Sequence, residues 1–214
     1  MKLKNCRICN GNSLIDYLNL GLMPAADAFI KEEFKSLNDP VYPLEVCLCD
    51  DCGISQLNYT VDPKILFQND YPYESSTTKT GRLHFDQFGE SVVKKAELSS
   101  DDLVIDIGSN VGVLLGAYQK RGCKVLGIEP SKHIAVSANE NGVETINDFI
   151  TPDLAKKIVS NKGQASVINI TNVFAHIDDL ESLMKAVDSL LTKDGMFVIE
   201  GPHFLNLIEA LEYD

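Results

Sequence analysis

The sequence of 214 residues has few basic residues and no long apolar run. Lysine and arginine number 19 against 31 acidic residues, which gives a formal net charge of −12 at pH 7. This balance argues against non-specific binding to nucleic acid or to anionic membranes, because both attract basic patches. No window approaches the ~18 apolar residues of a transmembrane helix, and the N-terminus lacks the apolar core of a signal peptide. We therefore expect a cytoplasmic chain that binds neither membrane nor nucleic acid.

The chain changes character along its length. Apolar residues make up 44% of it, enough for a sizeable core. The first part is rich in turns and weakly periodic, whereas short β-branched runs alternate with helix-length segments after residue 100, which is typical of βαβ units and a parallel sheet. We expect a small domain over residues 1–70, a linker and helix over 71–100, and an α/β domain over 101–214.

The periodicity of the second part predicts a doubly wound sheet of five strands with right-handed crossovers. The expected strands span 103–107, 124–129, 143–146, 165–170 and 196–200. The expected helices span 83–98 and 110–121, one from Ser131 to Gly142, one beginning at Thr151-Pro152, one from 178 or 179 to 193, and one over 204–213.

Five of the six cysteines lie within the first 52 residues. In a reducing compartment they are metal ligands or free thiols rather than disulfides. Cys6 and Cys9, like Cys49 and Cys52, form a C-x2-C pair, and each pair can direct two thiolates at one ion. Together they predict a closed tetrahedral zinc site with no open position for chemistry; reduced thiols without a metal are the alternative.

Cys47 competes with Cys49 for the metal. If this segment is extended, we expect the two side chains on opposite faces, so that only one meets the ion. We assign Cys49.

A glycine-containing loop, VIDIGSNVG, follows the first expected strand of the second part. Gly108 lets the backbone approach a ligand, and Gly112 relieves crowding where the helix starts. Glu129 comes 21 residues after Gly108, at the end of the next strand, where an acid can bind a ribose diol. Asp106 precedes the loop and suits a ligand with a cation. S-adenosylmethionine is therefore favoured over NAD, whose G-x-G-x-x-G is missing; a βα turn without a ligand is the alternative.

Short motifs follow one another over nearly the whole chain. They are Cys6-x2-Cys9, Leu20-Gly21-x2-Pro24-x-Ala26, Tyr42-Pro43-Leu44, Cys49-x2-Cys52-Gly53, Gln56-Leu57, Tyr71-Pro-Tyr73-Glu-Ser75-Ser76, Ile107-Gly-Ser-Asn110, Gly127-Ile-Glu129-Pro130-Ser131, Asn172-Val-Phe-Ala-His176-Ile and Phe197-Val-Ile-Glu200. In these motifs the sequence resembles the zinc-containing sugar-nucleotide C-methyltransferases, which act on 4-keto deoxysugars linked to a nucleoside diphosphate. The resemblance implies a zinc domain, a class I methyltransferase (Rossmann-like) domain and a further C-terminal domain.

The resemblance also implies roles for individual residues. His176 is a base or a donor to an enolate oxygen, unless it caps the following helix. Tyr73 reaches the sugar, with Tyr71 as second choice, unless it is a core residue. Asn110 and Asn172 lie at the cofactor.

For some other polar residues the sequence leaves two roles open. Ser75 and Ser76 offer hydroxyls to the ligands or cap a helix. His84 packs on the linker helix or contacts substrate, and His203 follows the last strand, at the sheet edge where ligands bind.

The chain departs from this family in two places. Val111 stands where the family carries an aspartate, and the chain stops at Asp214, before the family's Tyr-x-Glu-His motif. We expect a truncated enzyme, weakly active or inactive alone, that is completed by a C-terminal partner or forms a homodimer through the uncovered edge of its last strand. Its substrate is a nucleotide-linked keto sugar. The alternatives are a non-catalytic module that binds cofactor or nucleotide sugar and, less favoured, an NAD-dependent sugar enzyme.

Overall fold

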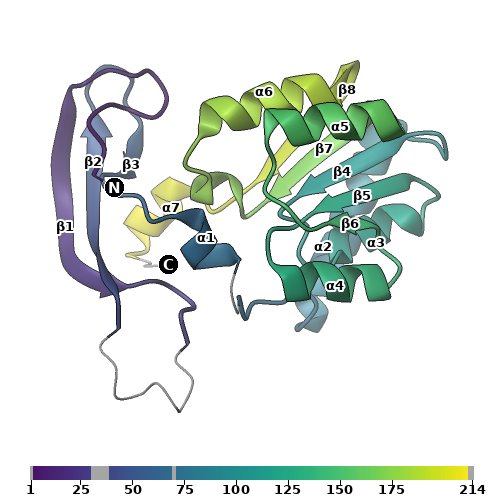
Figure 1. Ribbon diagram of the computed structural model, residues 1–214, viewed down its shortest axis with the longest axis horizontal. Coiled ribbons are helices and arrows are strands. Elements are labelled where there is room, and N and C mark those ends of the chain that lie inside the picture. The colour runs from purple at the N-terminus through teal and green to yellow at the C-terminus, as the bar shows by residue number, and fades with distance from the viewer. Residues whose placement is uncertain (1, 30–38, 69–70, 212–214) are drawn as a thin grey trace. The chain divides into compact units, whose positions relative to one another are not determined.

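The computed structural model describes residues 2–29, 39–68 and 71–211. The chain divides into two compact units (Figure 1). Unit 1 comprises Met1–Tyr73 and the short stretch Asp178–Glu181, and unit 2 comprises Glu74–Ile177 and Ser182–Asp214. None of the helices in the described part of the chain is both long and apolar enough to cross a membrane.

Unit 1 contains an antiparallel sheet of three strands in the order β1-β2-β3. They are β1 (Leu14–Pro24), β2 (Val41–Cys49) and β3 (Ser55–Leu57), and a short helix, α1 (Pro63–Phe67), follows. Asp62 caps α1 by accepting a hydrogen bond from the Lys64 backbone N–H at 2.9 Å. The turn at the end of β2 and the N-terminal turn are the two parts of this unit that carry the paired cysteines.

Unit 2 contains a parallel sheet of five strands in the order β6-β5-β4-β7-β8. The strands are β4 (Leu103–Ile107), β5 (Lys124–Ile128), β6 (Thr145–Ile146), β7 (Ala165–Thr171) and β8 (Leu191–Glu200). The strand order reverses beside β4. The carboxyl ends of β4, β5, β7 and β8 therefore lie along one edge, where open α/β sheets bind ligands.

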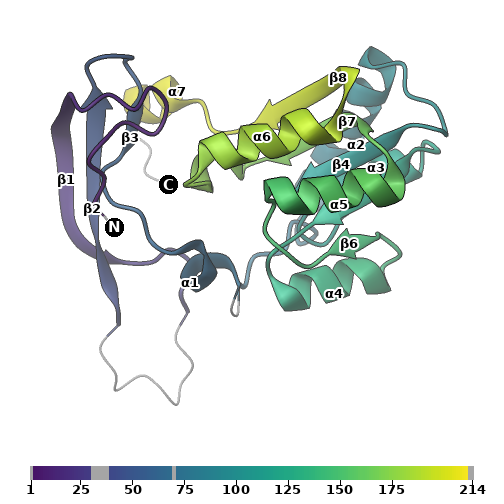
Figure 2. The same cartoon turned by 45° about the horizontal axis from the view of Figure 1, so that its top comes forward.

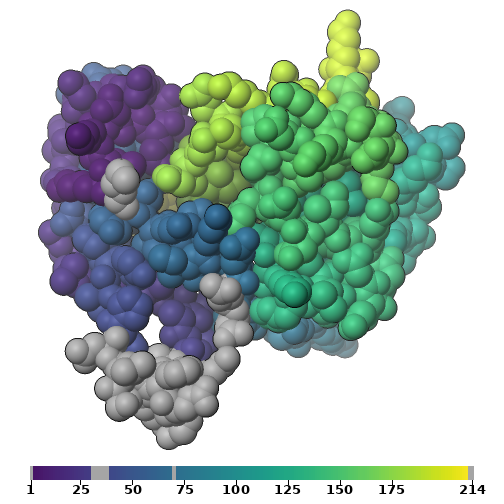
Figure 3. All heavy atoms as spheres, viewed as in Figure 1, coloured from purple at the N-terminus to yellow at the C-terminus, as the bar shows by residue number. Residues whose placement is uncertain are grey.

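Helices cover both faces of this sheet. They are α2 (Lys79–Lys95), α3 (Val113–Gln119), α4 (Lys132–Glu140), α5 (Pro152–Lys162) and α6 (Leu180–Leu190), with a 3-10 turn over Phe174–His176. A last short helix, α7 (Phe204–Glu209), follows β8 and has no buried residue. α5 and α6 lie on one face, and α2 and α3 lie on the other (Figure 2). In the space-filling view, atoms of α5 and α6 hide the sheet on the near side (Figure 3).

The core beneath the glycine loop packs α3 against the sheet and α2. Tyr118 and Leu115 of α3 are fully buried with Val104 and Val167 of the neighbouring strands β4 and β7. Burying such side chains gives about 1.5–3 kcal/mol each for the aliphatic residues. The loop that joins β4 to α3 is therefore held at both ends by rigid elements.

All five predicted strands of unit 2 are confirmed, and most boundaries shift by a few residues. The helix predicted over 110–121 begins only at Val113, because Asn110 and Gly112 adopt positive φ values of 51° and 80°, outside the helical region. The predicted helix end at 193 and strand start at 196 were wrong: α6 ends at Leu190, and β8 starts at Leu191, which pairs with Ala165. The last helix begins at 204 as predicted and ends at Glu209; Tyr213 lies outside the described residues.

Candidate functional site

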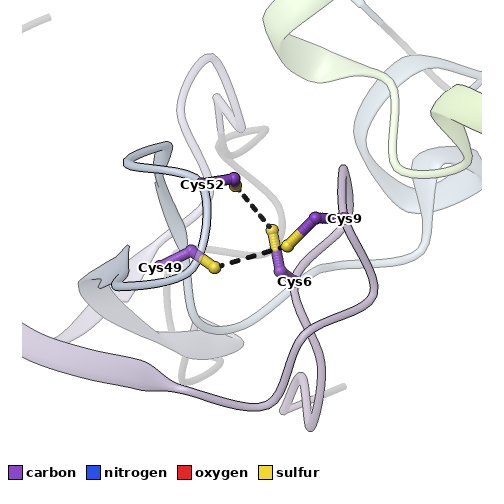
Figure 4. A group of neighbouring side chains, drawn as sticks. All are labelled: Cys6, Cys9, Cys49 and Cys52. Carbon is purple, nitrogen blue, oxygen red and sulfur yellow. Dashed lines mark hydrogen bonds between the residues drawn. The ribbon is translucent and has the colours of Figure 1, made fainter.

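The four predicted metal ligands come together in unit 1. Figure 4 shows Cys6 and Cys9 on one turn facing Cys49 and Cys52 on another. The Sγ atoms of Cys6 and Cys52 are 3.7 Å apart, those of Cys9 and Cys49 are 3.6 Å apart, and all four lie within 4.8 Å of one another. Zinc–sulfur bonds of about 2.3 Å in a tetrahedron place the sulfurs slightly under 4 Å apart. The cluster therefore has the spacing that zinc requires.

The turns also direct backbone N–H groups at the sulfurs. The Ile8 N–H points to Cys6 Sγ and the Gly11 N–H to Cys9 Sγ, each at 3.4 Å. Burial opposes ionisation of Cys6, yet the N–H groups of Cys9 and Ile8 lower its pKa to about 7. The pKa of Cys9 rises to about 12 despite the Gly11 N–H, because burial and the neighbouring sulfurs oppose a second negative charge. A divalent cation relieves this repulsion, since metal ligation deprotonates thiols.

Cys47 stays outside the cluster, as predicted, but the stated reason was wrong. Cys47 and Cys49 are two residues apart on β2, and side chains at that spacing share a face of a strand. Both are fully buried. Cys49 ends the strand and enters the turn with Cys52, whereas Cys47 accepts a contact from Gln56 Nε2 at 3.9 Å. The end of the strand, rather than alternation along it, selects the ligand.

In unit 2, the loop between β4 and α3 folds back on the end of β5. The backbone N–H groups of Gly108 and Ser109 both donate to the Ile128 carbonyl, at 2.8 and 3.2 Å. Gly108 has a φ of 73°, and a Cβ there would lie 2.6 Å from a methyl group of Val173. Only glycine fits this position, so the backbone stays bare and open to a ligand.

The predicted ribose-binding acid organises the same loop. The Glu129 carboxylate accepts hydrogen bonds from the Ser131 N–H at 2.8 Å and the Asn110 N–H at 3.0 Å. Its side chain is buried, and burial raises the pKa of Glu129 even though both N–H groups favour the charged form. Each carboxylate oxygen has a further lone pair available for a hydroxyl group. Glu129 can therefore hold the loop in place and bind a diol at the same time.

Asp106, the other predicted acid, is 2% exposed at the tip of β4, and its Oδ1 has no hydrogen-bond partner among the described residues. Burial first, and then the charge of Glu129, raise the pKa of Asp106 well above its ordinary value. Burial therefore favours the neutral form of this carboxyl group. A bound ammonium or sulfonium group would favour its ionised form.

This burial predicts a pH effect on stability. Because the pKa of Asp106 is higher in the folded than in the unfolded chain, its contribution is full below about pH 4 and is lost as pH rises towards the folded pKa. The free energy of unfolding of wild type, measured relative to that of Asp106→Asn, should fall by up to about 1.4 kcal/mol per pH unit. Chemical denaturation at several pH values between about 5 and 8 measures it. Parallel profiles for the two proteins would contradict the assignment.

Asn110 connects the loop to the segment before α2. Its Oδ1 accepts hydrogen bonds from the backbone N–H groups of Ser75 and Val111, both at 2.9 Å, and from the Ser75 hydroxyl at 3.3 Å. We expected Ser75 and Ser76 to contact a ligand or to cap a helix. The second alternative was wrong for α2, because the side chain that caps it is Thr78, which accepts from the Gly81 N–H. The Ser75–Asn110 link was missed because no spacing rule joins residues this far apart.

The remaining predicted residues follow β7 or belong to unit 1. Asn172 comes directly after β7 with a φ of 55°, and its N–H donates to the Glu200 carbonyl at 2.8 Å. His176 ends the 3-10 turn that follows and is exposed. Tyr73 is 54% exposed in unit 1, so it is not a buried core residue, and its ring meets that of Tyr71 at 6.5 Å. The structure thus brings the cofactor candidates to one edge of the parallel sheet.

Substituting Gly112 in this loop and Gly116 in the following helix should have opposite effects on stability. Gly112 has a φ of 80°, and a Cβ there would lie 2.8 Å from a Val143 methyl group. Gly112→Ala should therefore lower the free energy of unfolding by about 2 kcal/mol or more. Gly116→Ala, in open space within α3, should instead raise it by about 0.5–1 kcal/mol. Denaturant titration of both variants tests the loop geometry, and equal effects would refute it.

Comparison with known protein families gives one match in each of the two units. A family profile described as "Putative zinc binding domain" matches residues 6–67, and one described as "Methyltransferase domain" matches residues 85–212. The second match covers more than half of the chain, and the chain belongs to this methyltransferase family. S-adenosylmethionine is the cofactor of its domain, and zinc is the metal of its cysteine cluster.

Among individual proteins, the chain is similar to the C-methyltransferase NovU of Streptomyces niveus, with 29% identity over 212 residues. These residues are 99% of this chain and 50% of NovU, so the chain spans about half the length of this relative. The crystal structure of PH0226 from Pyrococcus horikoshii OT3 matches with a TM-score of 0.52 and 18% identity, over 65% of this chain and 62% of that one. That likeness supports the Rossmann-like fold predicted for unit 2.

Proposed function

We propose that this chain transfers a methyl group from S-adenosylmethionine to a carbon next to the ketone of a nucleotide-linked 4-keto deoxysugar. The observation that carries the proposal is the four-cysteine unit joined to a methyltransferase domain in a chain that aligns over 99% of its length with a C-methyltransferase. A carbon next to a ketone becomes nucleophilic once its proton is removed. Carbon methylation therefore suits a keto substrate.

In this proposal the loop residues hold the cofactor. The bare backbone at Gly108 and Gly112 admits it, Glu129 accepts from the ribose hydroxyls, and Asp106 faces its cationic end. Asn110 and Asn172 line the same sheet edge. The bound cofactor supplies an electrophilic methyl group on a sulfonium.

The chain's own residues prepare the substrate. We assign Tyr73 to the sugar and His176 either to the α-proton or to the developing enolate oxygen, where a hydrogen-bond donor lowers the barrier. The zinc site, closed by four thiolates, has a structural role.

We further propose that the chain works in the cytoplasm, where its cysteines stay reduced, and with a partner. The partner is a C-terminal domain or a second copy, because the chain spans about half of its relative. Because the chain spans only half of this relative, a second candidate function is a module that binds cofactor or nucleotide sugar without turnover.

Two measurements on the zinc-loaded chain test the proposal. Calorimetric titration should show micromolar binding of S-adenosylmethionine and none of NAD. Mass spectrometry of a nucleoside diphosphate-linked 4-keto-6-deoxyhexose incubated with the chain and cofactor should show a methylated sugar. Cofactor binding without methylation would favour the binding module, and no binding would refute both functions.

A further inference from the structure

A histidine–carboxylate pair lies in unit 2 outside the residues assigned so far. His84 Nε2 and Glu200 Oε2 are 2.8 Å apart, although the two residues are 116 positions apart in the sequence. His84 belongs to α2, and Glu200 is the last residue of β8. The side chains are 51% and 26% exposed, so solvent and ligands can reach the imidazole.

The pair sits at the carboxyl edge of the parallel sheet, away from the glycine loop. Glu200 ends β8, and its carbonyl accepts from the N–H of Asn172, which follows β7. The glycine loop follows β4 and meets the end of β5, so in the order β6-β5-β4-β7-β8 the pair lies at the opposite end of the same edge. If the glycine loop holds the cofactor, as in the proposed function, this end of the ligand-binding edge is left for the substrate.

The surroundings fix the imidazole. Its ring meets the ring of Phe85 at 5.4 Å and that of Phe88 at 6.1 Å, and both phenylalanines pack against the hydrophobic core. Glu200 engages Nε2, and Nδ1 makes no hydrogen bond to any other described residue. A carboxylate on one ring nitrogen orients the imidazole and makes the other nitrogen the proton acceptor.

A purely structural ion pair is a weaker explanation. Pairs this exposed contribute little to stability, because solvent screens them and both side chains lose freedom. The aromatic contacts already hold α2 to the core.

We propose that His84 and Glu200 form a proton-transfer pair for the keto substrate, an inference that rests on the proposed function and refines it. Neutral His84 takes the proton from the carbon next to the ketone at Nδ1, and the electron pair of the C–H bond forms the enolate. The enolate carbon bonds to the methyl group as the sulfur–methyl bond breaks, which leaves a neutral thioether. The imidazolium, stabilised by Glu200, returns its proton to solvent, and His176 is left to donate to the enolate oxygen.

Hydrogen exchange separates this step from methyl transfer. The 214-residue, zinc-loaded chain is incubated in deuterated buffer with a nucleoside diphosphate-linked 4-keto-6-deoxyhexose and no cofactor. Deuterium entering the carbon next to the ketone is measured by NMR against enzyme-free buffer. His84→Ala should lower this exchange by about a hundredfold or more, and Glu200→Gln by about tenfold or more. Glu209→Gln, the same change at an exposed residue of α7, should leave it unchanged.

Chemical rescue distinguishes proton transfer from a structural role. Added imidazole should restore exchange to His84→Ala, because the small base can occupy the space left by the ring. Equal exchange in wild type and His84→Ala, failure of imidazole to rescue, or no exchange in wild type above buffer would each overturn the pair. Exchange that depends on His84 without methylation in the presence of cofactor would support the pair and refute the proposed function instead.

Discussion

Cys9→Ser should strongly weaken zinc binding and thereby destabilise unit 1. The substitution exchanges one ligand sulfur for oxygen with little steric change at an exposed position. The zinc site joins the N-terminal turn to the end of β2, and structural zinc contributes on the order of 10 kcal/mol to such small units. Mutating a residue that only supports a metal ligand lowers metal affinity by about 10–100-fold. Because Cys9 is itself a ligand, we expect zinc affinity to fall by more than about a hundredfold. Competition with a chromophoric chelator measures it.

Two other cysteines supply the controls for this prediction. Cys47→Ala and Cys123→Ala should keep a full equivalent of zinc, since neither lies in the four-sulfur cluster. Cys47→Ala will still be destabilised, because its side chain is fully buried. Zinc loss in Cys47→Ala together with zinc retention in Cys49→Ser would overturn the ligand set.

The parallel sheet was predictable because its signals are local. The run Leu103–Ile107 is buried throughout, as its apolar sequence indicates for a strand covered on both faces. Thr151 caps α5 by accepting from the Leu154 N–H at 3.1 Å, with Pro152 at the first helical position. Residue type at these positions is enough to place the elements.

The sheet of unit 1 gave no such signal. β1 carries large exposed apolar side chains such as Ile15 and Leu22, and its pairing with β2 is interrupted by register shifts. Alternation between a buried and an exposed face is the main sign of a strand, and it is absent here. The zinc pairs were nevertheless predictable, because the spacing of the cysteines encodes the ligand geometry directly.

Within the candidate site, loop residues were predictable and long-range partners were not. Glycines after a strand indicate a ligand loop, but they do not reveal that Asn110 binds Ser75 or that Glu200 binds His84. Such contacts depend on how α2 packs against the sheet. The start of α3 was misplaced for a related reason, since the positive φ of Asn110 depends on its bonds to Glu129 and Ser75.

Glu129→Ala should lower affinity for S-adenosylmethionine by about a hundredfold or more. Hydrogen bonds to a charged group contribute about 1.5–3 kcal/mol each, and a ribose diol offers two. The variant also frees the N–H groups of Asn110 and Ser131 from their carboxylate partner. Calorimetry measures the loss, and Glu144→Ala, which removes an exposed partner of Lys162, is a matched control that should bind normally.

Testing two proteins against two ligands distinguishes a direct contact of Glu129 with the ribose diol from its indirect effect through the loop. Wild type and Glu129→Ala are each titrated with S-adenosylhomocysteine and with its 2′-deoxyribose analogue. If Glu129 binds the diol, wild type discriminates between the two ligands and the variant does not, since the coupling disappears with either partner. If both proteins discriminate equally, Glu129 acts only through Asn110 and Ser131, and the ribose must be held by other groups at the sheet edge.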